Sequence, residues 1–415
     1  MPKFNPFRPG HVIAPGMFCG RINEIQNIER GLFQTKNSNP FHFLIEGERG
    51  IGKTSLMLYF DWVARGKIPV NEIHFNFIVV NIELRSGMSQ EDIINAILEA
   101  LRREMSTREA LKNLCKNAWD FLSNFEVAGI KYNKSEDKSC VVKLDELTHT
   151  LLGIDTDAGD EIDGILILID EADSSDSTGR LGELCKLLTE RLTRKGCDRL
   201  CIGLAGLPGL VTNIKASHES AARIFSIMPL EPLELFERKQ VIASGLKNAE
   251  EKNGFNIKIT DEASNLLAGL SEGYPHFLQE FCFYAFNEDI DNSIDSDDVL
   301  QGAFSENGAI DQLGQKYYSE LYNDQIGSED YRIVLNCMAE ESDGWVSRQH
   351  LIEKSGVKMT IVDNALRVLK DRGIILVNPK ERGLYKLPTK SFAIWIKVKE
   401  SGKVANKLVQ LPTGS

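Results

Sequence analysis

Residues 47–54 combine glycines, a lysine and a threonine at a spacing that can bind phosphate. The stretch reads Gly-Glu-Arg-Gly-Ile-Gly-Lys-Thr, follows the largely apolar run 41–45 and precedes the sequence Ser-Leu-Met-Leu-Tyr-Phe. Glycines let successive backbone N–H groups point inward at a β-phosphate, and the following helix offers its positive N-terminus to the same anion. This order of strand, glycine loop and helix predicts a P-loop.

Each residue type in this loop has an expected task. We expect Lys53 to reach the β- and γ-phosphates of ATP and Thr54 to hold Mg²⁺. A glycine turn that merely precedes a lysine is the alternative, which the complete set of fixed positions and the flanking elements disfavour. The residues expected to line the nucleotide are Gly47, Gly50, Ile51, Gly52, Lys53, Thr54 and Ser55.

Two adjacent carboxylates end a run of branched aliphatic residues at 164–169. Such a run is typical of a central parallel strand that is covered on both faces, and the end of that strand opens into the ligand crevice of a doubly wound sheet. We expect Asp170 to hold the Mg²⁺ shell and Glu171 to polarise the attacking water, as catalytic residues beside Lys53. A buried strand that ends in a solvated acidic turn is the alternative, and the upstream P-loop disfavours it.

The elements around these motifs predict an α/β core with a parallel sheet. Further strands are expected at residues 75–84, 200–208 and 223–230, with helices between them. Residues 1–229 would form this core, in which 105–160 are an irregular insertion of helix, hairpin and helix. Residues 230–305 would form an all-helical lid without strands, and 306–328 a helical connector.

The pattern changes again over residues 329–415. A helix at 331–338, a second helix capped by Ser347 and a third helix at 360–371 precede two short apolar runs around a tight turn at 378–383. Gly373 ends the third helix. Three helices followed by a hairpin predict a winged helix-turn-helix domain.

Composition narrows the class of protein. The 415-residue chain carries a net charge of −12, yet residues 329–415 hold 15 Lys and Arg against 10 Asp and Glu, a net charge of +5 that leaves −17 for the rest. Contact with an anionic polymer would therefore be local to this end. The eight cysteines are scattered and form no Cys-x-x-Cys pair, so neither a zinc site nor a disulfide framework is indicated. With no apolar run of membrane-spanning length and no signal-peptide order, we expect a cytoplasmic protein without membrane contact.

These motifs, in this order, resemble the archaeal-type ATPases of the AAA+ and STAND group, relatives of the origin-recognition replication initiators. The resemblance covers nearly the whole chain. It implies that Phe18 and Arg21, in the box Phe-x-Gly-Arg, pack beside the adenine. It also implies that Pro275 and His276 face the nucleotide from the lid. The motifs that carry it are Phe18-x-Gly20-Arg21, the P-loop, Asp170-Glu171, Arg223, Gly273-Tyr274-Pro275 and the C-terminal winged helix.

The resemblance also offers a role for Arg223, just before the fifth strand. Its placement is similar to that of an arginine finger, which would complete a neighbouring subunit's site; an arginine that satisfies a helix C-terminus is the alternative. His276 stands where AAA+ initiators usually have arginine, and residues 203–206 carry no Asn, Thr or Ser to sense the γ-phosphate. We therefore expect a slow ATPase switch rather than a motor.

Three functions remain open for this ATPase. In the first, the winged helix binds double-stranded DNA, although Asp363 interrupts its basic face and solvated surface charge is the alternative. In the second, the protein is a signalling ATPase whose winged helix contacts an effector or regulatory protein, or whose output passes through homo-oligomers. The third is nucleotide binding without turnover, which Glu171 disfavours. The residues expected at DNA are Lys358, Arg367, Lys370, Arg372, Lys380 and Arg382.

Overall fold

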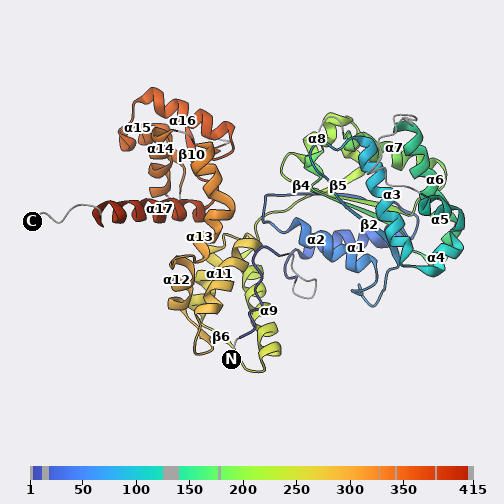
Figure 1. Ribbon diagram of the computed structural model, residues 1–415, viewed down its shortest axis with the longest axis horizontal. Coiled ribbons are helices and arrows are strands. Elements are labelled where there is room, and N and C mark those ends of the chain that lie inside the picture. The colour runs from blue at the N-terminus through green and yellow to red at the C-terminus, as the bar shows by residue number, and fades with distance from the viewer. Residues whose placement is uncertain are drawn as a thin grey trace, which may run out of the picture. The chain divides into compact units, whose positions relative to one another are not determined.

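The computed structural model divides the chain into two compact units. The core unit comprises the described residues within Val12–Glu231, and the C-terminal unit comprises residues 3–11 together with the described residues from Pro232 onward. Figure 1 shows both units. The structure describes residues 3–11, 18–124, 140–175, 179–326, 328–341, 344–378 and 381–409.

Five parallel strands form the sheet of the core unit in the spatial order β2-β3-β4-β1-β5. β3 and β4 are buried along nearly their whole length, as the continuous aliphatic runs predict for strands covered on both faces. Because all strands are parallel, the loops after β1 and β3 meet at one edge of the sheet. The strands are β1 (His42–Glu46), β2 (Phe77–Glu83), β3 (Gly164–Asp170), β4 (Leu200–Gly206) and β5 (Phe225–Pro229).

Helices cover both faces of this sheet. In Figure 1, α1 and α2 lie on one face, and α7 and α8 lie on the other. α3 begins with the capping box that the sequence indicates, because the Ser89 side chain accepts from Asp92 N and Asp92 accepts from Ser89 N. The helices are α1 (Ile22–Lys36), α2 (Lys53–Ala64), α3 (Gln90–Ser106), α7 (Leu181–Arg194) and α8 (Leu210–Ser217).

The described parts of segment 105–160 are helical and belong to the core. They form α4 (Glu109–Leu114), α5 (Lys116–Ser123), α6 (Cys140–Ala158) and one 3₁₀ turn (Gly159–Glu161). Their apolar side chains, including Leu111, Leu122, Leu144 and Leu147, pack into the same hydrophobic cluster as the sheet. The helices expected in this segment therefore pack into the core, whereas the expected hairpin falls mainly on residues 125–139, outside the described part of the chain.

Four helices at the expected positions begin the C-terminal unit after the core. One detail differs from an all-helical lid, because β6 (Lys258–Ile259) and β7 (Ser293–Ile294) pair in parallel. Strands of two residues are too short to give an alternating pattern, so the sequence could not indicate them. The helices are α9 (Leu235–Asn253), α10 (Asp261–Leu270), α11 (Pro275–Glu288) and α12 (Ser296–Phe304).

The next segment is helical, as expected, but it contains two π-helical turns. α13 (Ala309–Leu313) leads into π turns at Gly314–Tyr318 and Leu321–Gln325. The sequence pattern could not distinguish these wider turns from α-helix. Such turns are frequent at functional sites.

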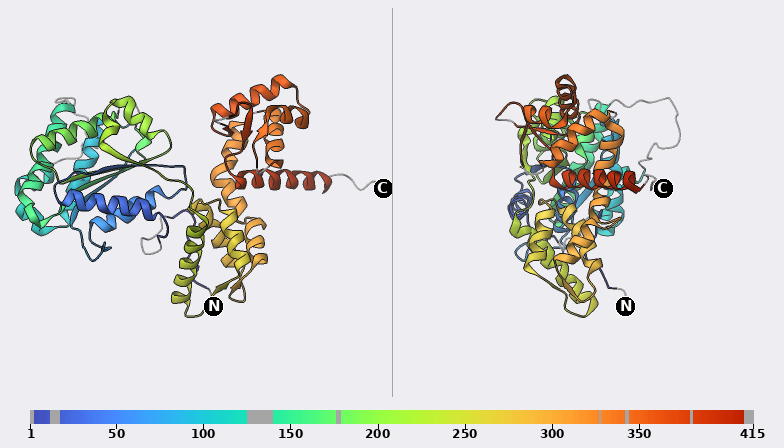
Figure 2. Two further views of the ribbon diagram at one scale, coloured as in Figure 1. Left: turned by 180° about the vertical axis from the view of Figure 1, so that it is seen from behind. Right: turned by 90° about the vertical axis from the view of Figure 1, so that its left-hand side faces the viewer.

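The last part of the chain combines helices with a small antiparallel sheet of order β8-β10-β9. Ser347 caps α15 as expected, because its Oγ accepts from His350 N at 3.1 Å. Figure 1 and Figure 2 show α17 beside α13 and α14, which it contacts. The elements are α14 (Glu329–Glu340), β8 (Val346–Ser347), α15 (Arg348–Ser355), α16 (Met359–Asp371), β9 (Leu376–Val377), β10 (Leu384–Lys386) and α17 (Lys390–Val409).

The sequence analysis did not include α17. Phe392, Trp395 and Ile396 are buried and follow helical spacing, which is the signal that could have found it. Its N-terminus is capped from α10's end: the Glu272 carboxylate accepts from the backbone N of Lys390 and of Ser391, both at 2.8 Å. Among the described residues, no helix is long and apolar enough to cross a membrane.

Candidate nucleotide-binding site

The loop between β1 and α2 has the conformation that a phosphate-binding loop requires. Gly50 and Gly52 adopt φ values of 80° and 100°, which side chains rarely tolerate. Gly47 N donates to Gly206 O at 3.1 Å, so the loop begins against the end of β4. A Cβ atom at Gly47 would lie 2.8 Å from Ile51 Cγ2, and α2 begins directly at Lys53. The glycines expected from the spacing are therefore each required by the local backbone.

The Lys53 ammonium lies inside this loop. Its Nζ donates to Gly47 O at 2.8 Å and to Glu48 O at 3.1 Å, and the residue is 8% exposed. Burial lowers the pKa of Lys53, and the negative charges of Glu171 and Asp170 oppose that shift. A cation is thus held at the N-terminus of α2, where an anion is also stabilised by the helix dipole.

Thr54 and Asp170 come together as the sequence predicts. Thr54 Oγ1 donates to Asp170 Oδ2 at 2.8 Å, and this bond joins the first turn of α2 to the end of β3. A hydroxyl and a carboxylate are hard oxygen ligands, which Mg²⁺ prefers. The donor set at this edge of the sheet therefore fits a magnesium ion.

Glu171 follows in a strained conformation, with φ 51°. Its N–H donates to Asp170 Oδ1 at 2.9 Å. Burial raises the pKa of Glu171, and the charges of Asp170 and Asp173 raise it further, whereas Lys53 lowers it. A non-glycine residue in this region together with a raised pKa is a combination that functional sites use.

Two carboxylates that the sequence analysis did not single out help to shape this edge. Asp173 Oδ1 accepts from Leu207 N at 2.8 Å, and Glu46 Oε1 accepts from Gly209 N at 2.6 Å. They join the ends of β3 and β1 to the turn before α8. The available signal was position, because each carboxylate lies within four residues of a predicted strand end.

The box that contains Phe18 and Arg21 contacts the P-loop and its helix. Arg21 Nη2 donates to Ile51 O at 3.1 Å, and the Arg21 side chain is 7% exposed. The Phe18 ring stacks on that of Tyr59 in α2, with ring centroids 5.6 Å apart. Tyr59, which the sequence analysis missed, donates its hydroxyl to Glu29 at 3.0 Å. Residues 18–21, which precede α1, thus pack against the P-loop and α2.

Arg223 lies at the opposite edge of the sheet from the P-loop. It is exposed in a 3₁₀ turn (Ala221–Ile224), so β5 starts two residues after it. The register pairs Phe225 with His42, the first residue of β1, whereas the P-loop follows the last. A five-residue strand separates these edges by about 16 Å. The structure therefore does not bring Arg223 to the P-loop of its own chain.

Pro275 and His276 open α11 in the C-terminal unit. The His276 ring lies edge-on against Tyr317, and its Nε2 is 3.5 Å from Glu280 Oε2. Burial lowers the pKa of His276 to about 4, and the Lys316 charge contributes to that shift. Lys316 Nζ also lies 2.7 Å from Glu280 Oε2, so α11 is bonded to the π turn that follows α13.

The basic residues of α16 project from an exposed surface. Arg348 neutralises the interrupting carboxylate, because its Nη2 donates to Asp363 Oδ2 at 2.8 Å and its Nε bonds the other oxygen. Lys380 lies outside the described residues. Within the described part of the chain, the remaining candidates are exposed, and their side chains make no hydrogen bond or ion pair: Lys358, Arg367, Lys370, Arg372 and Arg382.

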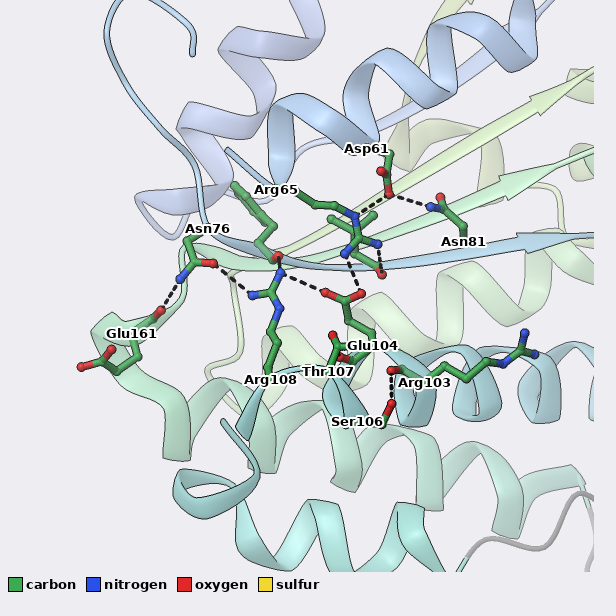
Figure 3. A network of polar contacts seen from close by, with 12 residues as sticks. Asp61, Arg65, Asn76, Asn81, Arg103, Glu104, Ser106, Thr107, Arg108 and Glu161 are labelled. Carbon is green, nitrogen blue, oxygen red and sulfur yellow. Dashed lines mark hydrogen bonds and ion pairs between the residues drawn. The ribbon is translucent and has the colours of Figure 1, made fainter. Parts of the chain in front are cut away.

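A buried polar network, which sequence reasoning missed, ties the P-loop helix to the sheet edge (Figure 3). Arg65, just after α2, donates Nε to Asp61 at 2.9 Å and Nη2 to Val79 O at 3.1 Å. Its Nη1 donates to Glu104 Oε2 at 2.6 Å, and Arg108 lies 2.9 Å from the other Glu104 oxygen. These guanidinium groups cover backbone carbonyls of β2, the edge strand, which protects that edge from pairing.

Comparison with known proteins bears on the fold of the chain. A family model described as the bacterial TniB protein matches residues 20–130. A Walker-type ATPase of Pyrococcus abyssi is 16% identical, with 92% of this chain and 96% of that chain covered and a TM-score of 0.55. The ORC2 protein of Aeropyrum pernix, in ADPNP–ADP complexes, is 15% identical over 98% and 99% of the two chains, with a TM-score of 0.55. No curated protein matches the chain. These likenesses confirm the expected P-loop ATPase fold.

Proposed function

We propose that this chain, which has the P-loop ATPase fold of the origin-recognition proteins, is a slow ATP-hydrolysing switch that couples its nucleotide state to DNA association. The observation that carries the proposal is the meeting of Thr54, Asp170, Lys53 and Glu171 at one edge of the sheet. The TniB-like segment and the ATPase fold agree with it.

The P-loop residues would divide the work of binding and hydrolysis. Lys53 and the N-terminus of α2 would hold the phosphates, while Thr54 and Asp170 would hold Mg²⁺. Bound Mg²⁺ supplies positive charge to the phosphate oxygens. Glu171 would orient the attacking water and accept its proton, for which a raised pKa is suited near neutral pH. Phe18, Arg21 and Ser55 would complete the site from the core unit.

Two further expectations concern groups outside this edge. Because Arg223 cannot reach its own P-loop from the other edge of the sheet, its proposed role is to complete the site of a second copy in a homo-oligomer. Pro275 and His276 would face the nucleotide from the lid. A neutral His276 provides less charge there than an arginine would, which favours slow turnover.

The output of the switch would be a winged helix-turn-helix formed by α14 to β10. Its support is the exposed row of cations on α16 and the neutralisation of Asp363 by Arg348, which removes the charge that argued against DNA. The Glu272 cap and the Lys316–Glu280 pair bond the lid to the C-terminal elements. Lid and winged helix would therefore move as one body.

The test is fluorescence anisotropy of a labelled DNA duplex titrated with the full chain, with and without ATP and Mg²⁺, at two salt concentrations. We expect salt-sensitive binding whose affinity changes with nucleotide. Phosphate release measured in parallel separates turnover from binding alone. Absence of duplex binding under every condition would refute the DNA part of the proposal.

A second candidate is a signalling ATPase whose C-terminal domain binds a protein. A groove of about 700 Å³, lined by Glu340, Glu341, Trp345 and His350 among others, favours this alternative. Trp345 is 38% exposed, and aromatic residues are enriched at protein interfaces. Nucleotide binding without any duplex binding would favour this candidate.

A further inference from the structure

Residues 3–11 form a segment without regular secondary structure that packs on helices of the C-terminal unit, although the sequence analysis assigned them to the core. Phe4 N donates to Asn253 Oδ1 at 2.7 Å, and Asn253 Nδ2 returns a bond to Phe4 O at 3.0 Å. Arg8 N donates to Gln279 Oε1 at 3.0 Å. α9 and α11 thus hold the same segment, which we call the strap (residues 3–11).

The strap carries one buried anchor, Phe7, which is 2% exposed. Its ring meets Phe286 edge-on at 6.3 Å and lies directly over Gly245. A Cβ atom at Gly245 would be 2.5 Å from the Phe7 ring, so any side chain there would collide with it. Glycine in the middle of a helix costs stability, and Gly245 lies in the middle of α9. The Phe7 ring therefore packs against the helix backbone at Gly245, where only glycine leaves room for it.

In the core unit, the described chain resumes at Phe18, and the residues that follow contact the P-loop. Ten residues after His11, Arg21 donates to Ile51 O at 3.1 Å. The other covalent link between the two units leaves the core after Glu231, and a Cβ at Gly47 would lie 3.2 Å from Cβ of the preceding residue, Leu230. Both links therefore reach the core unit at the loop that would hold the phosphates.

We infer that the strap is a second tether between the lid and the P-loop, and that Phe7 is a positioning residue for nucleotide binding. The inference rests on the proposed function, since it takes ATP as the ligand. Two tethers that start at the P-loop restrict the lid in the free protein, so less conformational freedom is lost when a nucleotide orders it. Releasing the strap would leave a single hinge and would weaken binding.

The experiment compares the full chain with Phe7→Ala and Gly245→Leu. One measurement is the Kd of a fluorescent ATP analogue with Mg²⁺, and the other is hydrogen–deuterium exchange of residues 4–8 with and without that analogue. Both variants should raise Kd roughly fivefold or more, within the usual range for coupled sites, and leave kcat at saturating ATP unchanged. Exchange over residues 4–8 should slow with nucleotide in the wild type and stay fast in both variants.

Matched variants separate the tether from general packing. Phe236→Ala removes a 57% exposed phenylalanine from the same helix α9 and should leave Kd and strap exchange unchanged. Adding Gly245→Ala to Phe7→Ala should weaken nucleotide binding no further, because no ring then packs over residue 245. Asn253→Ala removes only the two hydrogen bonds to Phe4 and provides a milder release if Phe7→Ala unfolds the lid.

The outcomes distinguish this inference from the function on which it rests. Variants that lose strap protection but bind the analogue as tightly as the wild type would overturn the inference and leave the ATPase proposal intact. A wild-type protein that does not bind the analogue would overturn both. Weaker binding in Phe7→Ala, Gly245→Leu and Asn253→Ala, with normal binding in Phe236→Ala, would support the tether.

Discussion

The P-loop edge and the exposed face of α16 hold their charged groups in opposite ways. At the P-loop, Lys53 donates to two carbonyls and Thr54 donates to Asp170. On α16, within the described residues, cations such as Arg367 and Lys370 extend into solvent without a partner. A fixed arrangement suits chemistry at one atom, whereas free cations suit a polymer of phosphates. One chain thus separates a site of fixed geometry from a surface of diffuse charge.

The largest expected effect lies on the fixed side of this comparison. Glu171→Gln should keep ATP binding and lower turnover by roughly 10²- to 10⁴-fold, because the amide cannot accept the proton of the water. Phosphate release and analogue binding measure the two properties separately. Glu83→Gln, at the register position beside Asp170, serves as the control and should retain turnover. Turnover by Glu171→Gln at the wild-type rate would assign the base elsewhere.

The second prediction concerns the stability of the core unit and its dependence on the burial of an ion pair. Arg65→Ala removes a partner from Asp61 and Glu104, whose side chains are each 8% exposed, and should destabilise the unit by about 3 kcal/mol. Arg103→Ala is the matched change, since Arg103 is 72% exposed and pairs only at the surface with Glu99. Urea unfolding, with hydrogen exchange of α2 and β2 as the local readout, compares the two. An equal loss of stability in the two variants would contradict a stabilising role of the Arg65 network.

The sequence was sufficient to predict an element where its residue pattern was long, or a site where its motif was complete. β3 was predictable because seven residues of a covered parallel strand leave a continuous aliphatic run, and the P-loop because its glycines meet a local backbone requirement. The Arg65 network and the seating of Phe7 over Gly245 depend on side chains far apart in the sequence, whose meeting no local pattern encodes. The two-residue strands β6 and β7 were too short to show a period.

A smaller effect is expected on the diffuse side. Arg367→Ala should weaken duplex binding by about 1 kcal/mol and reduce the slope of log affinity against log salt by about 0.9, the value for one phosphate contact. Lys354→Ala is the matched control, because Lys354 is already held by Glu340 and Glu341, each at 2.8 Å. Anisotropy at several salt concentrations measures both quantities. Equal slopes for the two variants would remove the distinction between free and paired cations.

The smallest expected effect concerns how the neighbouring carboxylates change the pKa of Glu171. Because burial and the charges of Asp170 and Asp173 raise the pKa of Glu171, its basic form should appear only above the ordinary glutamate range. Turnover should therefore rise with pH through that raised pKa.

Asp173→Asn removes one of the charges that raise the pKa of Glu171 but keeps an oxygen for the bond from Leu207 N. The acid limb of kcat/KM should therefore move to lower pH. Asp160→Asn, on an exposed turn before β3 at the opposite edge of the sheet, should leave the limb in place. A limb that Asp173→Asn does not move would mean that another group titrates. Asp173 would then be held in place at this edge of the sheet without setting the pKa of the catalytic base.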